Sequence, residues 1–284
     1  MINKTKNIHW FPGHMKKAII KISESLKLVD FVVEMLDSRI PLSSQNEYIE
    51  RVISAKPRLY VLTKADLADE KVTQEWVKAL EKEGNKAIAV DLKKQGAYKL
   101  VLDKMLEFCK EKEEKKAKKG IRNVTTRGMI VGIPNVGKST FINYLAKKTI
   151  AQTGNTPGLT RNVRWVKLNK LELMDTPGIL EPQYEEKTKA MHLACVGSMK
   201  DIILPKDEIA EYVFKFVKEN YSKAVMERYK LDNLDDEYEV YRTIAKKRGF
   251  LLKDGELDID KAIDIFLNEF KNGIITNYSL ERPE

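Results

Sequence analysis

One segment of the chain has residue types and a spacing that suit phosphate binding: residues 132–139, which read G-I-P-N-V-G-K-S. In such a loop the backbone N–H groups face phosphate oxygens, the lysine reaches the β- and γ-phosphates, and the final hydroxyl binds Mg²⁺. We therefore expect Lys138 to act on the phosphates and Ser139 to be a Mg²⁺ ligand. The predicted binding loop comprises Asn135, Val136, Gly137, Lys138, Ser139 and Thr140.

The residues on both sides of this loop support the same interpretation. Residues 128–131 are a short apolar run that suits a buried strand, and residues 140–146 place apolar side chains at helical spacing. Strand, glycine loop and helix are the context in which the pattern becomes a binding site. A chance turn with a surface lysine is the weaker alternative.

A carboxylate stands at the end of another apolar run, residues 170–174, which predict a strand that leads into Asp175-Thr-Pro-Gly178. Asp175 follows Lys138 by 37 residues. At this distance from a phosphate loop, an aspartate that closes a strand is suited to the Mg²⁺ side of the site. Between the two motifs, residues 153–161 are polar, rich in turn residues and without an apolar period.

The elements that must position these groups alternate along the chain. Residues 30–36, 58–62, 86–90 and 163–168 predict further strands, with helices between several of them. Such alternation predicts an α/β fold with a mainly parallel sheet covered on both faces. After Pro205 only the helical period remains. The predicted parts are a basic arm and helix at 1–28, an α/β domain at 29–204 with a charged linker at about 110–120, and an all-α domain at 205–284. The charged run at 110–119 is typical of a solvated helix end plus a connector.

A base-recognition motif follows the predicted strand at 58–62, where residues 63–66 read T-K-A-D and match [NT]-K-x-D. The Asp66 carboxylate can accept hydrogen bonds from both N1–H and the 2-amino group of guanine, while Lys64 packs its stem on the base. Thr63, Lys64 and Asp66 are therefore predicted to bind GTP. The motif precedes the phosphate loop, whereas ordinary GTPases have it after that loop. A single sheet can still form, because strands need to be adjacent in space and not in sequence.

In this order of motifs the chain resembles the YlqF/RbgA family of circularly permuted ribosome-assembly GTPases. The resemblance covers nearly the whole chain and rests also on W-F-P-G-H-M at 10–15, D-S-R-I-P at 37–41 and T-P-G-L-T at 156–160. It implies a circularly permuted Ras-like P-loop GTPase domain followed by a C-terminal all-α domain. It also implies a GTP hydrolase that binds the large ribosomal subunit precursor and couples hydrolysis to a late assembly step. A GTP-regulated RNA-binding or RNA-modification factor outside ribosome assembly is the alternative, and a nucleotide-gated module without useful turnover is a third reading.

The resemblance implies roles for further residues. Thr160 would be the switch threonine that binds Mg²⁺ and closes on the γ-phosphate, with Thr156 as a less favoured substitute. Asp175 would hold Mg²⁺ through water, and the N–H of Gly178 would sense the γ-phosphate. The chain departs from the family at 90–93, where V-D-L-K replaces the usual S-A-K motif. For that reason no side chain is assigned to the base there.

Hydrolysis is expected to be slow in the isolated protein, because Ile179 follows the D-T-P-G motif and cannot orient a water molecule by hydrogen bonding. His9 is the first candidate for a catalytic group that places the water, and His14 is the second. Asn135 is a candidate K⁺ ligand, because an asparagine at this place goes with K⁺ activation in related GTPases. Stimulation by the ribosomal subunit is expected.

The charge of the chain suits an RNA partner. The net charge is +9, but residues 206–284 hold 14 Lys and Arg against 18 Asp and Glu, so that part carries −4 and the first 205 residues carry +13. The basic part suits a polyanion, and the resemblance selects the rRNA of the large subunit. In the acidic helical part, binding would depend on local clusters such as Lys246, Lys247 and Arg248.

Other features indicate a cytoplasmic protein. No apolar run approaches the roughly 18–20 residues that span a membrane, and we expect no secretory signal at the N-terminus. Cys109 and Cys195 are far apart and are expected to be reduced thiols. We expect a monomer with GTP and GDP as ligands and without a membrane partner.

Overall fold

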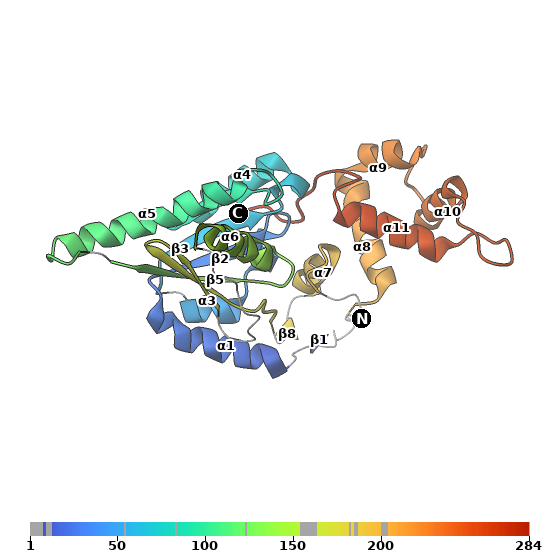
Figure 1. Ribbon diagram of the computed structural model, residues 1–284. Coiled ribbons are helices and arrows are strands. Elements are labelled where there is room, and N and C mark those ends of the chain that lie inside the picture. Colours follow the sequence, from blue (N-terminus) through green and yellow to red (C-terminus); the bar gives the residue numbers. More distant parts are fainter. Residues whose placement is uncertain are drawn as a thin grey trace. The chain divides into compact units, whose positions relative to one another are not determined.

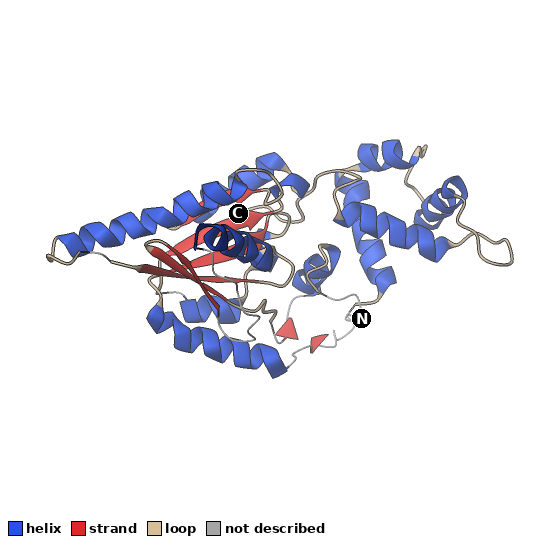
Figure 2. Cartoon of the chain, viewed as in Figure 1, coloured by secondary structure: helices blue, strands red, loops and turns tan. Residues whose placement is uncertain are grey.

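The structure is a computed structural model that describes residues 8–9, 13–53, 55–82, 84–122, 124–153, 164–181, 183–184, 187–199 and 204–283. Their side chains are described except at 8–9, 13–18, 147–153, 164 and 183. The chain divides into two compact units. The α/β unit comprises Met1–Glu185 and Ser279–Glu284, and the helical unit comprises Glu186–Tyr278. All named strands belong to the α/β unit (Figure 2).

The α/β unit contains a six-stranded sheet with the order β4-β3-β2-β5-β7-β6. Neighbouring strands are parallel except for β6, which is antiparallel to β7. Each strand of this sheet begins and ends within two residues of a strand predicted from the sequence. The strands are β2 (Phe31–Asp37), β3 (Arg58–Thr63), β4 (Lys86–Val90), β5 (Thr126–Gly132), β6 (Arg164–Leu168) and β7 (Leu171–Asp175).

Strand β2 explains how the permuted order forms one sheet. It lies between β3 and β5, so that Asp37 pairs with Thr63 on one side and Met35 with Gly132 on the other. The strand that carries the T-K-A-D motif and the strand that carries the phosphate loop therefore end at the same edge, although their order in the chain is reversed.

Helices cover both faces of the sheet. In Figure 1, α5 runs along one side of it, while α1 and α3 lie on the other. Helix α4 packs on the Leu36 and Tyr60 face through Trp76, and Phe108 of α5 stacks on Phe31 with ring centroids 4.5 Å apart. These helices and the short elements between them are α1 (Gly13–Ser25), η1 (Leu26–Leu28), α2 (Pro41–Ser44), α3 (Glu47–Ile53), η2 (Ala65–Leu67), α4 (Glu70–Lys82), α5 (Ala97–Ala117) and α6 (Lys138–Thr153).

In the structure α5 continues to Ala117, so the charged linker predicted at about 110–120 consists mainly of the solvated helix end that we expected and only briefly of a connector. Lysine and glutamate have good helix propensity, and this end of the helix is fixed by ion pairs. Lys112 Nζ lies 2.7 Å from Asp30 Oδ2, and Glu113 Oε1 lies 2.7 Å from Lys170 Nζ. A run of alternating charge is here the exposed end of a packed helix.

The helical unit begins earlier than the boundary that we predicted at 204/205. It includes α7, whose His192 Nε2 lies 2.8 Å from the hydroxyl of Tyr212 on α8. Aromatic rings fill its core, with Phe266 in contact with Phe214, Tyr229 and Tyr241. No helix among the described residues is long and apolar enough to cross a membrane. The helices are α7 (Lys187–Cys195), α8 (Lys206–Asn220), α9 (Ser222–Tyr229), α10 (Glu237–Arg248) and α11 (Ile259–Lys271).

Two basic side chains of the cluster at residues 246–248 form hydrogen bonds within the helical unit. Arg248 donates to the buried Glu269 over 3.1 Å, and Lys247 Nζ donates to the Tyr229 carbonyl over 3.3 Å. Arg228 binds the same carboxylate through two nitrogens at 2.8 Å. Two of the three predicted RNA contacts therefore also stabilise the fold at the C-terminal end of α10.

Candidate functional site

Five loops follow the carboxyl ends of β4, β3, β2, β5 and β7, which are neighbours and parallel. This is the edge at which open α/β sheets bind ligands. The sequence motifs lie in these loops, at residues 90–93, 63–66, 37–41, 132–139 and 175–178 respectively. The fold therefore brings to one edge groups that are up to 141 positions apart in the chain, from Asp37 to Gly178.

The phosphate loop has a backbone that only particular residues can adopt. Gly132 has φ +148°, and a Cβ atom there would lie 2.4 Å from the Met35 carbonyl oxygen. Gly137 has φ +109°, and Asn135 is left-handed with φ +58°. Glycine at 132 is thus required by the close approach of β2, and the loop leads directly into the N-terminus of α6. The exposed Ser139 and Thr140 lie in the first turn of that helix.

Lys138 is buried in this loop, with its side chain 5% exposed. Its Nζ donates to the carbonyl oxygens of Gly132 at 2.9 Å and Ile133 at 2.6 Å. Burial lowers the pKa of Lys138 to about 8, although the charge of Asp175 acts in the opposite direction. A cationic group held in a site of low polarity is suited to bind phosphate, which returns the pKa toward its ordinary value.

The T-K-A-D motif is fastened to the phosphate loop. Thr63 Oγ1 lies 2.7 Å from the Val136 carbonyl oxygen. Lys64 is left-handed with φ +57°, and its Nζ lies 2.9 Å from Asp37 Oδ2. Asp66 Oδ1 is buried and has no hydrogen-bond partner in the described part of the chain. A buried oxygen without a hydrogen bond costs free energy, so this acceptor is suited to receive a hydrogen bond from an N–H group of a ligand.

The loop after β4 supplies two residues that the sequence did not identify. Lys93 Nζ lies 3.2 Å from Asp66 Oδ2, and the Lys93 side chain is 77% exposed. A methyl group of Leu92 lies 3.1 Å from the point where a Cβ of Gly137 would be. This loop therefore borders both the T-K-A-D motif and the phosphate loop, although it lacks the family's S-A-K pattern.

Asp37 and Arg39 form a buried ion pair beside Lys64. Arg39 donates to the Asp37 carboxylate from Nε over 2.8 Å and from a terminal nitrogen over 2.7 Å, and the two side chains are 1% and 0% exposed. Burial by itself raises the pKa of Asp37, but Arg39 and then Lys64 outweigh it and lower the pKa to about 2. From the sequence, Asp37 and Arg39 were only part of the D-S-R-I-P motif, with no role predicted for either side chain. The D-x-R spacing was the available signal.

The D-T-P-G loop packs against the other side of the phosphate loop. A Cβ on Gly178 would lie 2.8 Å from Pro134 Cα and 3.0 Å from Lys138 Nζ. Thr176 donates its hydroxyl to the Ile130 carbonyl over 2.6 Å, which fixes the start of the loop to β5. The absence of a side chain at Gly178 therefore allows its backbone to reach the phosphate loop.

The residues near this point fit a Mg²⁺ ion. Ser139 offers a hydroxyl at the start of α6, and Asp175 offers a partly buried carboxylate at the end of β7. Mg²⁺ prefers oxygen ligands and usually has one or two carboxylates together with phosphate oxygens and water. Thr160, the third predicted Mg²⁺ ligand, lies outside the described residues, as does Thr156.

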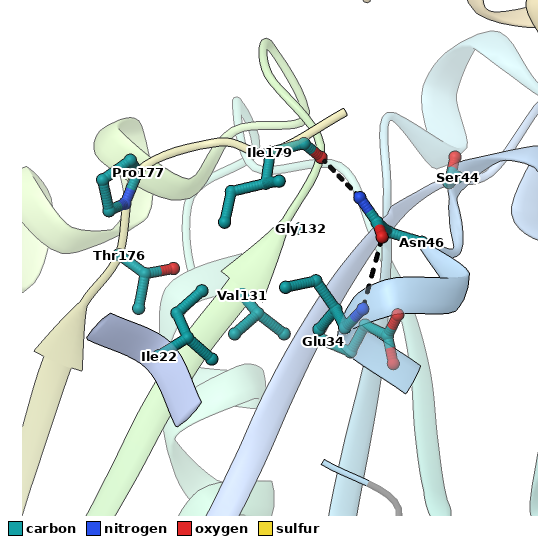
Figure 3. A pocket seen from close by; sticks show the side chains of 10 residues that line it. Ile22, Glu34, Ser44, Asn46, Val131, Gly132, Thr176, Pro177 and Ile179 are labelled. Carbon is teal, nitrogen blue, oxygen red and sulfur yellow. Dashed lines mark hydrogen bonds between the residues drawn. The ribbon is translucent and has the colours of Figure 1, made fainter. Parts of the chain in front are cut away.

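A small pocket next to the D-T-P-G loop contains polar groups that the sequence did not identify (Figure 3). Asn46 donates from Nδ2 to the Ile179 carbonyl over 3.2 Å, and its Oδ1 accepts from the backbone of Tyr48 over 3.0 Å. Glu34 borders the same pocket, and burial followed by the charge of Glu50 raises its pKa well above the ordinary value. Asn46 therefore links the turn after β2 to the residue that follows Gly178.

The predicted histidines are described through their backbone only. His9 lies in the short strand β1 (Ile8–His9), which pairs antiparallel with β8 (Gln183–Tyr184), His9 opposite Gln183. His14 lies near the start of α1. Residues 8–9 thus run along the segment that follows the D-T-P-G loop, and the side chains of His9 and His14 lie outside the described ones.

Known proteins resemble the chain over almost its whole length. A Bacillus cereus protein named Ribosome biogenesis GTPase A is 43% identical over 98% of this chain and 94% of that protein. The Thermotoga maritima protein of the same name is 34% identical over 97% and 94%. The chain belongs to the Ribosome biogenesis GTPase A family. The family model described as 50S ribosome-binding GTPase matches residues 127–243.

Solved structures agree with this assignment to the Ribosome biogenesis GTPase A family. The GNP-bound YlqF from T. maritima superimposes with a TM-score of 0.67 at 29% identity, covering 94% of this chain and 99% of that one. Its GDP-bound form gives a TM-score of 0.66. The family, the circularly permuted GTPase fold and the GTP hydrolase class that we predicted are thereby confirmed. The roles of the individual site residues stay predictions.

The low pKa of Lys138 predicts that nucleotide binding takes up protons in alkaline solution. Phosphate raises the pKa of Lys138, so at about pH 9 the side chain is mostly neutral in the free protein and protonated in the complex. GDP affinity should therefore fall as the pH rises through about 8. Calorimetry in two buffers of different ionisation enthalpy measures this proton uptake. The Lys138 contribution should shrink at about pH 7, and identical heats in both buffers at about pH 9 would contradict the assignment.

Proposed function

We propose that this GTPase docks on the precursor of the large ribosomal subunit and couples GTP hydrolysis to a late assembly step. The names of its relatives support this role, because they describe ribosome biogenesis GTPases and, at 30% identity in the mouse, a mitochondrial ribosome-associated GTPase. We place the protein in the cytoplasm as a monomer. Its ligands are GTP, GDP and the rRNA of the large subunit.

The observation that carries guanine recognition is the geometry around Asp66. One carboxylate oxygen is buried without a partner among the described residues, and the other is held by Lys93. The carboxylate is thereby oriented with an acceptor available for the N1–H and 2-amino donors of guanine. Lys64, held by Asp37, packs its stem on the base.

Asp66→Asn should therefore change the base preference. The amide cannot accept from both guanine donors, so GTP affinity should fall about a hundredfold while xanthosine triphosphate binds better than to the parent protein. Competition with a fluorescent GDP measures both affinities. Asp69→Asn is the matched control, because the Asp69 carboxylate accepts from the Val72 N–H in the first turn of α4 over 3.0 Å, and an asparagine oxygen can accept there as well. Equal binding of ATP and GTP by the parent protein would overturn guanine specificity.

For hydrolysis, we assign the binding of the phosphates to Lys138. We assign the response to the γ-phosphate, the switch function, to Thr160 and Gly178. Mg²⁺, held by Ser139, Thr160 and Asp175, would supply charge stabilisation to the β- and γ-phosphates. Ile179 has no hydrogen-bonding side chain, so another group must orient the attacking water. We assign this to His9, with His14 as the alternative. The pairing of β1 with β8 supports a place for the arm next to the D-T-P-G segment.

Potassium should accelerate hydrolysis through Asn135. This residue is exposed in the phosphate loop with left-handed backbone, from which its side-chain oxygen can complete a cation site beside the phosphates. GTP turnover should be faster in K⁺ than in Na⁺, and Asn135→Ala should remove the difference. Asn169→Ala is the matched control, since Asn169 is also exposed and left-handed, φ +53°, but lies in the β6–β7 turn. Equal rates in both salts would contradict the K⁺ site.

The GTP-bound form should bind the large subunit more tightly than the GDP-bound form, and the subunit should accelerate hydrolysis. The first 205 residues carry +13, so contacts to rRNA should be dominated by phosphates and affinity should fall steeply with salt. Co-sedimentation with each subunit in GDP and in a non-hydrolysable GTP analogue, across a salt series, measures this. Equal binding to both subunits without nucleotide preference would favour a general GTP-regulated RNA-binding factor instead.

A further inference from the structure

The last residues of the chain belong to the α/β unit and not to the helical unit that precedes them. The helical unit ends at Tyr278, and Ser279–Glu284 groups with Met1–Glu185. Leu280 N–H donates to the Arg39 carbonyl over 2.9 Å. Trp76 Nε1 donates to the Glu281 carbonyl over 3.2 Å. These contacts fix the C-terminal segment, residues 279–283, next to the turn that follows β2.

The Glu281 side chain binds the start of α2 through several hydrogen bonds. Its carboxylate accepts from the backbone N–H of Leu42 over 2.7 Å and of Ser43 over 3.0 Å, and also from the Ser43 hydroxyl. These donors lie in the first turn of α2, where backbone N–H groups have no partner within a helix. A carboxylate distant in sequence therefore holds α2 at its start.

A chain of hydrogen bonds connects α2 with the base-binding lysine. Ser44 Oγ accepts from Asp37 N–H over 3.1 Å, so α2 is joined at its other end to the strand that it follows. The Arg39 backbone is held by Leu280, and its side chain clamps the Asp37 carboxylate. That carboxylate holds Lys64 Nζ at 2.9 Å. Each link involves a buried or half-buried group, which restricts alternative arrangements.

We propose that the C-terminal segment is a positioning element of the guanine site, with Glu281 as its main positioning residue. By holding α2 and the Arg39 backbone, it keeps the Asp37–Arg39 pair and Lys64 in the geometry that binds the base. The inference rests on the proposed guanine recognition by Lys64 and Asp66. Because water can reach the Leu42 contact, losing the carboxylate should loosen this geometry more than it destabilises the fold.

The test compares the rate of GDP release in Glu281→Ala, Glu281→Gln and the parent protein. Glu281→Ala should release fluorescent GDP about tenfold faster, because it removes three accepted hydrogen bonds from α2. Glu281→Gln keeps an acceptor oxygen and should show a smaller acceleration. Glu256→Ala, which removes an exposed acid from the helical unit, should release GDP at the parent rate. An unchanged rate in Glu281→Ala would overturn the proposal.

A double-mutant cycle separates positioning from general structural support. Lys64→Met removes the end point of the proposed route, so adding Glu281→Ala to it should produce little further acceleration. If the two effects multiply fully, Glu281 does not act through Lys64 and the proposal fails. Should Glu281→Ala lose its cooperative unfolding transition, Glu281→Gln takes its place in the cycle. A parent protein that does not prefer GDP to ADP would overturn guanine recognition, whereas a preference for GDP without a Glu281 effect would overturn this inference alone.

Discussion

The carboxylate of Asp37 is the point on which the nucleotide edge of the sheet depends. It is fully buried at the end of β2 and receives hydrogen bonds from Arg39 and Lys64, which come from two different loops. Burying such charges is unfavourable unless their geometry is nearly complete, and here the pair is bidentate with the lysine as a third partner. The low pKa of Asp37, about 2, means that the ion pair persists at neutral pH and weakens only as the pH falls toward that value. We infer that the pair fixes the direction of Lys64 more than it stabilises the fold.

The phosphate loop in turn has fixed neighbours on both sides. Thr63 donates its hydroxyl to the carbonyl of Val136, so that the base motif and the phosphate loop are directly joined. On the other side Gly178 lies against Pro134, and Ile179 is held through its carbonyl by Asn46. Asn46 and Arg39 belong to the same short stretch after β2. The base motif and the D-T-P-G loop are therefore joined both through the phosphate loop and through the stretch after β2.

The sequence was sufficient for the strands of the six-stranded sheet and for the motifs that lie at their ends, because apolar runs and glycine–lysine spacing are local signals. Gly132 and Lys138 are examples, since their neighbours in the chain already indicate their conformation. It was insufficient for groups whose partners are distant. Lys93 reaches Asp66 from another loop, and Glu281 reaches Ser43 across 238 positions. The start of the helical unit at Glu186 was missed, because it is the contact of α7 with α8 that places α7 in this unit, and the sequence of α7 alone does not show this contact. The sequence did not locate the end of α5, because a Lys–Glu run has the same composition in a linker and in an exposed helix end.

The return of residues 279–283 to the α/β unit makes the helical unit an insertion within the nucleotide-binding unit. During translation the polypeptide of the α/β unit is therefore interrupted at Glu185 and continues only after the whole helical unit has been made. At roughly 5–20 residues per second this delay amounts to about 5–20 seconds. During this interval the Glu281 carboxylate, which accepts from the N–H groups at the start of α2, has not yet been synthesised. Completion of the nucleotide edge is then a late event in biosynthesis, and a nascent chain that has reached only α11 has all the phosphate-binding residues but not the segment that contacts Arg39.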